Sequence, residues 1–174
     1  MFKTLITGAA KRVGAELARA CAADAHIVVL HYNQNKAAAE ALGDELRTKG
    51  ALIELVHADL CDSASVSDMM TAASKTGPIT GLINNASLFD YDDSETVSAE
   101  KIAHHMAVNL IAPALLIKDV AAQLPQGAKG CVINMLDAKL FGMNPDYYSY
   151  TLSKSALHTL TTMAAQAYAP NLRV

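Results

Sequence analysis

The stretch Thr7-Gly8-Ala9-Ala10-Lys11-Arg12-Val13-Gly14, residues 7–14, decides the fold of this chain. The apolar run at residues 3–7 predicts a strand before it, and the amphipathic run at residues 13–23 predicts a helix after it. Gly8 permits a tight reversal, and the unpaired N–H groups that begin a helix face outward, which forms a site for a pyrophosphate. Gly8 and Gly14 alone would also fit an ordinary packed turn, so the strand and the helix around them favour a dinucleotide-binding fold.

Short apolar runs alternate with longer amphipathic runs along the rest of the chain, and this alternation predicts parallel βαβ units. Further strands are expected at residues 26–31, 52–57, 79–84 and 130–136, and further helices at 36–49, 63–75, 99–124 and 148–168. The helix at 99–124 is expected to be interrupted near Pro113. We therefore predict one α/β domain over residues 1–174, a Rossmann-type doubly wound parallel sheet with strand order 3-2-1-4-5-6.

The last residues, Leu172-Arg173-Val174, have the pattern of the beginning of a sixth strand. A right-handed crossover after the helix at 148–168 normally returns the chain to the sheet as such a strand. The sequence leaves this strand no room to finish, so we expect the sheet to be incomplete at its C-terminal end.

Composition limits the class of partner. Of the 174 residues 52% are apolar, which is enough for one well-packed core. The formal net charge is -3 without a run of Lys or Arg, so neither nucleic acid nor an anionic membrane is expected as a partner. Cys21, Cys61 and Cys131 have no CxxC spacing, which argues against a disulfide framework or a zinc site. We expect a cytoplasmic protein, because residues 1–6 already form a strand pattern that leaves no room for a signal peptide, and no apolar run reads as long enough to span a bilayer.

A tyrosine and a lysine one helical turn apart, Tyr150 and Lys154, form the second informative feature, with Asp137 upstream. A phenol has a reference pKa of about 10 and is a poor acid–base group at neutral pH. An ammonium group one turn away favours the phenolate, so we expect Lys154 to lower the pKa of Tyr150 into the working range. Taken alone, the two residues could equally be a pair on a helix surface.

Five motifs, in this order, resemble the short-chain dehydrogenase/reductase family over essentially the whole chain. They are Thr7 to Gly14, His57-Ala58-Asp59-Leu60, Asn84-Asn85-Ala86, Asn109 and Tyr150-Thr151-Leu152-Ser153-Lys154. The resemblance implies a redox enzyme in which Tyr150 and Lys154 are catalytic, Asp137 stands where the family usually has a serine, and Asn109 supports a water that passes protons. Family members usually continue with another strand, a substrate-covering loop and a final strand, so we expect this chain to lack the usual C-terminal substrate loop and last strand.

Three departures from the common family pattern are similar to its pteridine reductase branch. Arg12 replaces a turn glycine, Asp137 replaces the serine, and Ser87 replaces the glycine after Asn85-Ala86. That branch continues its fourth-strand motif as Asn-Ala-Ser-x-Phe, which here ends at Phe89. The resemblance implies that Phe89 stacks on a flat bicyclic substrate and that Ser87 and Arg12 bond to its polar edge or to the cofactor phosphates. Phe89 could equally be an ordinary core residue.

The end of the second expected strand indicates which dinucleotide is bound. An enzyme that prefers NAD places an Asp or Glu there to accept from the ribose 2′-hydroxyl, and this carboxylate would repel a 2′-phosphate. Residues 31–36 are His-Tyr-Asn-Gln-Asn-Lys, without a carboxylate, and Lys11 and Arg12 lie in the facing turn. We therefore predict NADPH. By resemblance, Asp59 accepts from the adenine amino group, with Leu60 alongside. The expected cofactor-binding residues are Gly8, Lys11, Arg12, Val13, Gly14, His31, Tyr32, Asn33, Gln34, Asn35, Asp59, Leu60, Asn85, Ala86, Ser87, Tyr150 and Lys154.

These observations predict an NADPH-dependent reductase that delivers a hydride to the carbon of a C=N bond while Tyr150 supplies a proton to the nitrogen. The expected substrate is a dihydropterin or dihydrofolate, because an acid at position 137 can share a proton with a ring nitrogen whereas a serine would donate to a carbonyl oxygen. The expected substrate-binding residues are Arg12, Ser87, Phe89, Asp137 and Tyr150. Two alternatives stay open: a carbonyl or 3-oxoacyl reductase of the same family, and a shortened nucleotide-binding chain without turnover.

Two further expectations concern metals and assembly. His104 and His105 are adjacent on a helix, where neighbouring side chains diverge by about 100°, so no metal site is expected there. By resemblance to the family, we expect a homo-oligomer, a tetramer or dimer, that pairs through residues of about 113–124 and 148–168.

Overall fold

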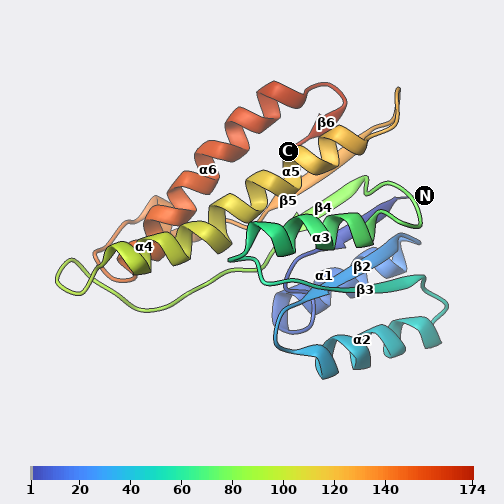
Figure 1. Cartoon of the computed structure of the whole chain (residues 1–174), viewed down its shortest axis with the longest axis horizontal. Helices are drawn as coiled ribbons and strands as arrows, with labels where there is room; N and C mark the ends of the chain where they lie inside the picture. Colours follow the sequence, from blue (N-terminus) through green and yellow to red (C-terminus); the bar gives the residue numbers. More distant parts are fainter. Residues whose placement is uncertain (1) are drawn as a thin grey trace.

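The computed structural model describes residues 2–174, so Met1 of the strand-like pattern at residues 1–6 lies outside the described residues. They form a sheet with helices on both faces (Figure 1). The strands are β1 (Lys3–Ile6), β2 (Ile27–Tyr32), β3 (Ile53–His57), β4 (Gly81–Asn84), β5 (Gly130–Asn134) and β6 (Leu172–Arg173). The helices are α1 (Arg12–Ala23), α2 (Lys36–Thr48), α3 (Ser63–Ala73), α4 (Ala99–Met106), α5 (Ala112–Gln123) and α6 (Tyr148–Tyr168). A π-turn, η1 (Ala107–Ile111), joins α4 to α5, and a 3-10 turn, η2 (Ala138–Phe141), follows β5.

The sheet has the strand order β3-β2-β1-β4-β5-β6, and each neighbouring pair is parallel. This confirms the predicted Rossmann-type sheet. The short β6 pairs with β5 in the register Gly130 to Leu172 and Cys131 to Arg173, which confirms the expected beginning of a sixth strand. The order of the strands reverses between β1 and β4, and sheets of this kind bind ligands at the carboxyl ends of the strands beside such a reversal.

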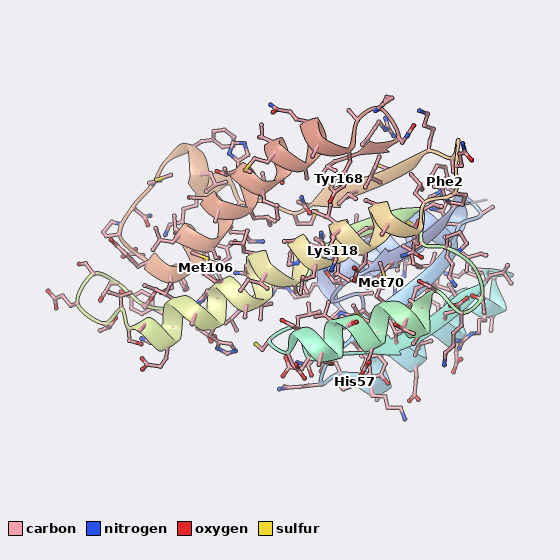
Figure 2. The ribbon with its side chains drawn as sticks, turned by 45° about the horizontal axis from the view of Figure 1, so that its top comes forward. Phe2, His57, Met70, Met106, Lys118 and Tyr168 are labelled. Carbon is pink, nitrogen blue, oxygen red and sulfur yellow. The ribbon has the colours of Figure 1, made fainter. Side chains whose placement is uncertain are left out.

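Two apolar cores lie on opposite faces of the sheet. Successive strand residues point to opposite faces, so Ile6 packs with α1 and α2 whereas Leu5 packs with α3 and α5. Both side chains are fully buried. Figure 2 shows α3, which carries Met70, lying beside α5, which carries Lys118. Helices therefore pack against β1 on both faces of the sheet, and the glycine turn begins at the end of this rigid strand.

The long helical run Ala99–Gln123 differs from expectation in two ways. The π-turn η1, rather than Pro113, separates α4 from α5, and Pro113 lies in the first turn of α5, where a missing N–H costs least. The run is also long and apolar enough by length and composition to cross a membrane, with a window of mean hydropathy 1.3, so the expectation that no run would qualify is wrong. Core helices meet the same measure, and this run packs against α3, α6 and β4.

Candidate active site

A cavity of about 860 Å³ opens where the parallel strands end, and this volume is at the upper end of small-molecule sites. Its walls come from the turn after β1, the ends of β2 and β3, the segments after β4 and β5, and the first turns of α6. The predicted site residues that line it are Gly8, Lys11, Arg12, Val13, Gly14, His31, Tyr32, Asn33, Gln34, Asn35, Asp59, Leu60, Asn85, Ala86, Ser87, Phe89, Asp137, Tyr150 and Lys154. Asn109 lies behind this wall and is 1% exposed.

The glycine turn after β1 closes so tightly that it requires both of its glycines. Gly8 has a φ of +63°, in the left-handed region that favours glycine. A Cβ on Gly14 would lie 2.3 Å from the carbonyl oxygen of Gly8 and 2.7 Å from Nδ2 of Asn85. Asn85 Nδ2 donates to the carbonyl oxygens of Thr7 and Gly8, at 2.9 and 3.1 Å. These contacts clamp the turn between α1 and the end of β4.

Arg12 begins α1 with a positive φ of +54°. This backbone conformation costs a residue with a Cβ about 1–2 kcal/mol, which explains why glycine is favoured at such a position. The Arg12 side chain is exposed and lines the cavity. The chain therefore tolerates local backbone strain where it places a guanidinium at the cavity wall.

His31 is held by the protein through both nitrogens of its ring. It is 2% exposed, its Nδ1 accepts from the Gly8 N–H at 3.0 Å, and its Nε2 lies 3.1 Å from the Ala58 carbonyl oxygen. An N–H needs an acceptor and a carbonyl needs a donor, so we assign the neutral tautomer with its proton on Nε2. Burial lowers the pKa of His31 to about 4. His31 lines the cavity as expected of a cofactor-binding residue, but both of its ring nitrogens are engaged by the protein, and the ring ties the glycine turn to the residues after β3.

Polar side chains follow β2 at the rim of the cavity. Lys11 Nζ donates to Oδ1 of Asn35 at 2.8 Å, which joins the glycine turn to the loop after β2. Asn33 and Gln34 are exposed at the same rim, and residues 31–36 contain no carboxylate. With Arg12 beside Lys11, this rim has a local positive charge and favours an anionic group.

The loop after β3 forms the neighbouring part of the wall. Asp59 accepts from the Cys61 N–H through Oδ1 at 2.9 Å, and its own N–H donates to Ser65 Oγ at 3.0 Å. Leu60 is buried beside it. The loop is therefore held by its own hydrogen bonds, with an exposed carboxylate next to an apolar side chain.

Residues 87–92, here called the active-site strap, follow β4 and are held by Asn109. Asn109 Oδ1 accepts from the Leu88 N–H at 2.8 Å, and Nδ2 donates to Leu88 O at 3.0 Å and to Ser153 Oγ at 2.9 Å. Asn109 lies within η1, and π-turns are frequent at functional sites. Both ends of the Asn109 side-chain amide are engaged by Leu88 and Ser153, and its expected support of a water stays a prediction.

Tyr150, Asp137 and Lys154 meet beside the end of β5. The Tyr150 hydroxyl donates to Asp137 Oδ2 at 2.6 Å, a short, charge-assisted hydrogen bond. Lys154 Nζ donates to the carbonyl oxygen of Met135 at 2.8 Å and lies 5.8 Å from the centre of the Tyr150 ring. Tyr150 and Lys154 are both buried.

The electrostatics of this group reverse one expectation. Burial raises the pKa of Tyr150, and the hydrogen bond and charge of Asp137 raise it further. The Tyr150 hydrogen bond lowers the pKa of Asp137, and burial lowers the pKa of Lys154 to about 8. We expected Lys154 to favour the phenolate. Burial and the carboxylate in direct contact act more strongly than the more distant ammonium, so Tyr150 is a neutral phenol beside an ionised Asp137.

Phe89 forms an aromatic wall of the cavity, and its 52% exposed side chain excludes the alternative of an ordinary core residue. Its ring stacks on Tyr147, with centroids 4.1 Å apart and an interplanar angle of 8°. Tyr150 stands nearly perpendicular to it, with centroids 4.6 Å apart and an angle of 83°. Phe89 is therefore oriented by contacts with two tyrosines.

Several cavity-lining residues were not predicted from the sequence. They are Ala10, Cys61, Leu88, His104, Val108, Met135 and Leu136. Met135 and Leu136 directly follow β5, and the rule that strand ends line such sites could have found them. His104 and Val108 lie on the helical run before Asn109, at a spacing that places both on one face.

Comparisons with known proteins agree with this geometry. A family model described as short chain dehydrogenase matches residues 3–174. The solved structure of FolM alternative dihydrofolate reductase 1 from Brucella suis, in complex with NADP, has a TM-score of 0.95 and 36% sequence identity, covering 99% of this chain and 72% of that one.

Two curated relatives extend this comparison. An oxidoreductase of Methylorubrum extorquens is 28% identical over 167 residues, which are 95% of this chain and 66% of that protein. Pteridine reductase 1 of Leishmania tarentolae is 30% identical over 200 residues, covering 92% of this chain and 69% of that protein. The chain thus spans about two thirds of the length of the curated relatives that it matches.

Proposed function

Because the chain belongs to the short chain dehydrogenase family, we propose that it is an NADPH-dependent reductase that acts on a C=N bond of a dihydropterin or dihydrofolate. The hydrogen bond of 2.6 Å from Tyr150 to Asp137 is the observation that carries this proposal. The similarity to a dihydrofolate reductase and to a pteridine reductase supports the same substrate class.

The cavity fits NADPH in three of its parts. The glycine turn and the start of α1 would hold the pyrophosphate, because helix N-termini present unpaired N–H groups. Lys11, Arg12 and the amides of Asn33 and Gln34 would hold a 2′-phosphate, with no carboxylate among residues 31–36 to repel it. Asp59 would accept from the adenine. When bound, the reduced nicotinamide would supply a hydride to the substrate carbon.

Tyr150 would supply the proton. Its hydroxyl is held by Asp137 at 2.6 Å and its pKa is raised, so the phenol keeps its proton at neutral pH until a base takes it. A substrate nitrogen that accepts this proton leaves a phenolate beside the Asp137 carboxylate. Lys154, which lies 5.8 Å from the Tyr150 ring centre, offsets part of that negative charge.

The raised pKa of Tyr150 favours an imine over a ketone as substrate. A weak acid protonates a strongly basic acceptor more readily than a weakly basic acceptor. The nitrogen of a C=N bond is more basic than a carbonyl oxygen. Asp137 would also repel the alkoxide that develops when a ketone is reduced. The same carboxylate that keeps Tyr150 protonated therefore selects the bond to be reduced.

Phe89 would hold the substrate ring. Its side chain is half exposed in the cavity and lies against Tyr150, so a flat ring stacked on it would lie near the proton donor. Ser87 and Arg12 line the same cavity and would bond to the polar edge of such a ring.

The test is to follow NADPH oxidation with a dihydropterin and, in parallel, with a 3-oxoacyl thioester, using Tyr150→Phe as the control for tyrosine-dependent chemistry. Turnover of the dihydropterin that disappears in Tyr150→Phe is the expected result. Turnover of the thioester alone would instead identify a carbonyl reductase. NADPH binding without turnover of either would identify a nucleotide-binding chain and contradict the proposal.

A further inference from the structure

Helix α6 carries both Tyr150 and Lys154, yet its own N-terminus has no local side-chain cap. Among the described residues, the N-cap Tyr147 makes no side-chain hydrogen bond to the helix, and its φ is +53°. The first turn of an α-helix leaves several N–H groups without an intrahelical partner. Tyr150 lies within this turn, so the helix end that needs a cap is also the part that holds the proton donor.

Asp92, from the active-site strap, supplies this cap from a distant part of the chain. Its Oδ1 accepts from the Ser149 N–H at 2.9 Å, and its Oδ2 accepts from the Ser149 hydroxyl. Its carbonyl oxygen accepts from the Tyr148 N–H at 3.1 Å. Asp92 is 0% exposed, as is Ser149. A carboxylate at a helix N-terminus is stabilised by the helix dipole, so its burial here is compensated.

The active-site strap therefore contacts α6 at two points. Asp92 binds the residue directly before Tyr150, and Phe89 stacks on Tyr147 and meets the Tyr150 ring edge-on. Asn109 holds the beginning of the strap through Leu88. Asp92 bonds Ser149 and the Tyr148 main chain and not the Tyr150 hydroxyl, which is held by Asp137, so an effect of Asp92 on Tyr150 would pass through the position of the helix turn.

We infer that Asp92 is a positioning residue that, through Ser149, fixes the first turn of α6 against the active-site strap and so sets the phenol of Tyr150 relative to Asp137 and Phe89. This inference rests on the proposed function for its kinetic consequences. Its structural part, the link between the strap and α6, stands apart from any substrate.

Asp93 offers a matched control next in the chain. Its Oδ1 accepts from the N–H groups of Glu95 and Thr96, at 3.0 and 2.9 Å, and from the Thr96 hydroxyl. Its Oδ2 also accepts from the Tyr91 hydroxyl at 3.3 Å, and none of these hydrogen bonds is made with α6. Asp93→Ala therefore removes a carboxylate with several hydrogen bonds while leaving the α6 cap intact.

The experiment compares Asp92→Ala, Asp92→Asn, Ser149→Ala and Asp93→Ala by NADPH affinity, by kcat and KM for a dihydropterin, and by amide hydrogen exchange of residues 148–154. Misplacing a catalytic group by about 1 Å can cost roughly a hundredfold in rate, so Asp92→Ala should lower kcat about 10- to 100-fold with unchanged NADPH affinity. Asp92→Asn should recover most of this, because its amide can still accept from the Ser149 N–H and donate to the hydroxyl. Exchange in residues 148–154 should rise in Asp92→Ala and not in Asp93→Ala.

A purely stabilising role predicts a different pattern, in which Asp92→Ala and Asp93→Ala lower the melting temperature but leave kcat unchanged in the folded enzyme. That pattern would overturn the inference. If Asp92→Ala does not fold, Ser149→Ala decides: lower kcat with faster exchange supports the link, and wild-type values for both overturn it. If wild-type protein consumes no NADPH with any substrate, the proposed function has failed, and the exchange rates alone still decide the link: faster exchange in Asp92→Ala than in Asp93→Ala supports it, and equal exchange overturns it.

Discussion

The two halves of the cavity are built in different ways. The half around the glycine turn lies at the ends of β1, β2 and β4, where sheet register and close backbone contacts leave little freedom. The half around Tyr150 lies on loops and on one helix end, and is joined by single side-chain hydrogen bonds such as Tyr150 to Asp137 and Lys154 to Met135. Changes in the first half should therefore act through backbone shape, and changes in the second through the chemistry of one side chain.

The largest effect is expected from Tyr150→Phe. Loss of a positioned proton donor typically costs about 10²- to 10⁴-fold in rate, and the buried ring of phenylalanine keeps the packing. NADPH affinity, measured by fluorescence titration, should stay within about twofold, because the glycine turn is built independently. A comparable loss of NADPH affinity would show that the two halves are not separable.

The next effect concerns His31 and pH. Its pKa is about 4 in the folded protein and about 6.5 when the ring is exposed to water in the unfolded chain, so the unfolded chain binds its proton first as pH falls. The neutral ring therefore contributes stability above about pH 6.5 that is lost progressively toward pH 4, up to an order of 3 kcal/mol. Urea unfolding at several pH values should show that the free energy of unfolding falls more steeply with decreasing pH for wild type than for His31→Asn. Identical pH dependence in the two would contradict the assigned role of His31.

Gly14→Ala should weaken NADPH binding by steric displacement of the turn. The added Cβ would lie 2.3 Å from the Gly8 carbonyl oxygen, and overpacking of this kind costs about 1–3 kcal/mol. We expect roughly a 10- to 100-fold loss of affinity and a lower melting temperature. Gly142→Ala is the control, since among the described residues nothing lies within 4 Å of its added Cβ. Equal effects of the two changes would refute the steric argument.

Arg12→Gly should give the smallest change in NADPH affinity. It distinguishes the effect of the backbone conformation at this position from the effect of the side-chain charge. Glycine relieves the positive φ of +54°, so the melting temperature should hold or rise slightly. Loss of the guanidinium should weaken NADPH binding about five- to tenfold. Arg12→Lys keeps the charge and the strained backbone, and should lose less affinity. If Arg12→Gly binds NADPH as wild type does, Arg12 does not contact the cofactor.

The sequence predicted the sheet and the glycine turn well because these depend on local patterns. Glycines at residues 7–14 and apolar runs at strand spacing determine the backbone whatever surrounds them. Residue spacing also identified Tyr150, Asp137 and Lys154 as a group. The direction of the Tyr150 pKa shift was predicted wrongly, since burial and a contact distance of 2.6 Å to Asp137 decide it and neither is visible in a sequence.

Other misses have the same origin. His31 occurs in the stretch that was expected to bind a phosphate. Both nitrogens of its ring are instead hydrogen-bonded to the protein, one to Gly8 and the other to Ala58. Asp92 lies among the acidic residues of segment 90–93, and its partner Ser149 lies far along the chain. Contacts between loops that no sheet holds in register leave no periodic pattern to read.

The central claim is that Asp137, by keeping Tyr150 protonated, selects a C=N bond over a ketone. The most direct test is the ratio of kcat/KM for a dihydropterin to kcat/KM for a 3-oxoacyl thioester, in wild type and in Asp137→Ser. Serine removes the charge that raises the Tyr150 pKa and restores a donor to a carbonyl oxygen, so the ratio should fall by about tenfold or more, with thioester activity rising. An unchanged ratio would contradict the account.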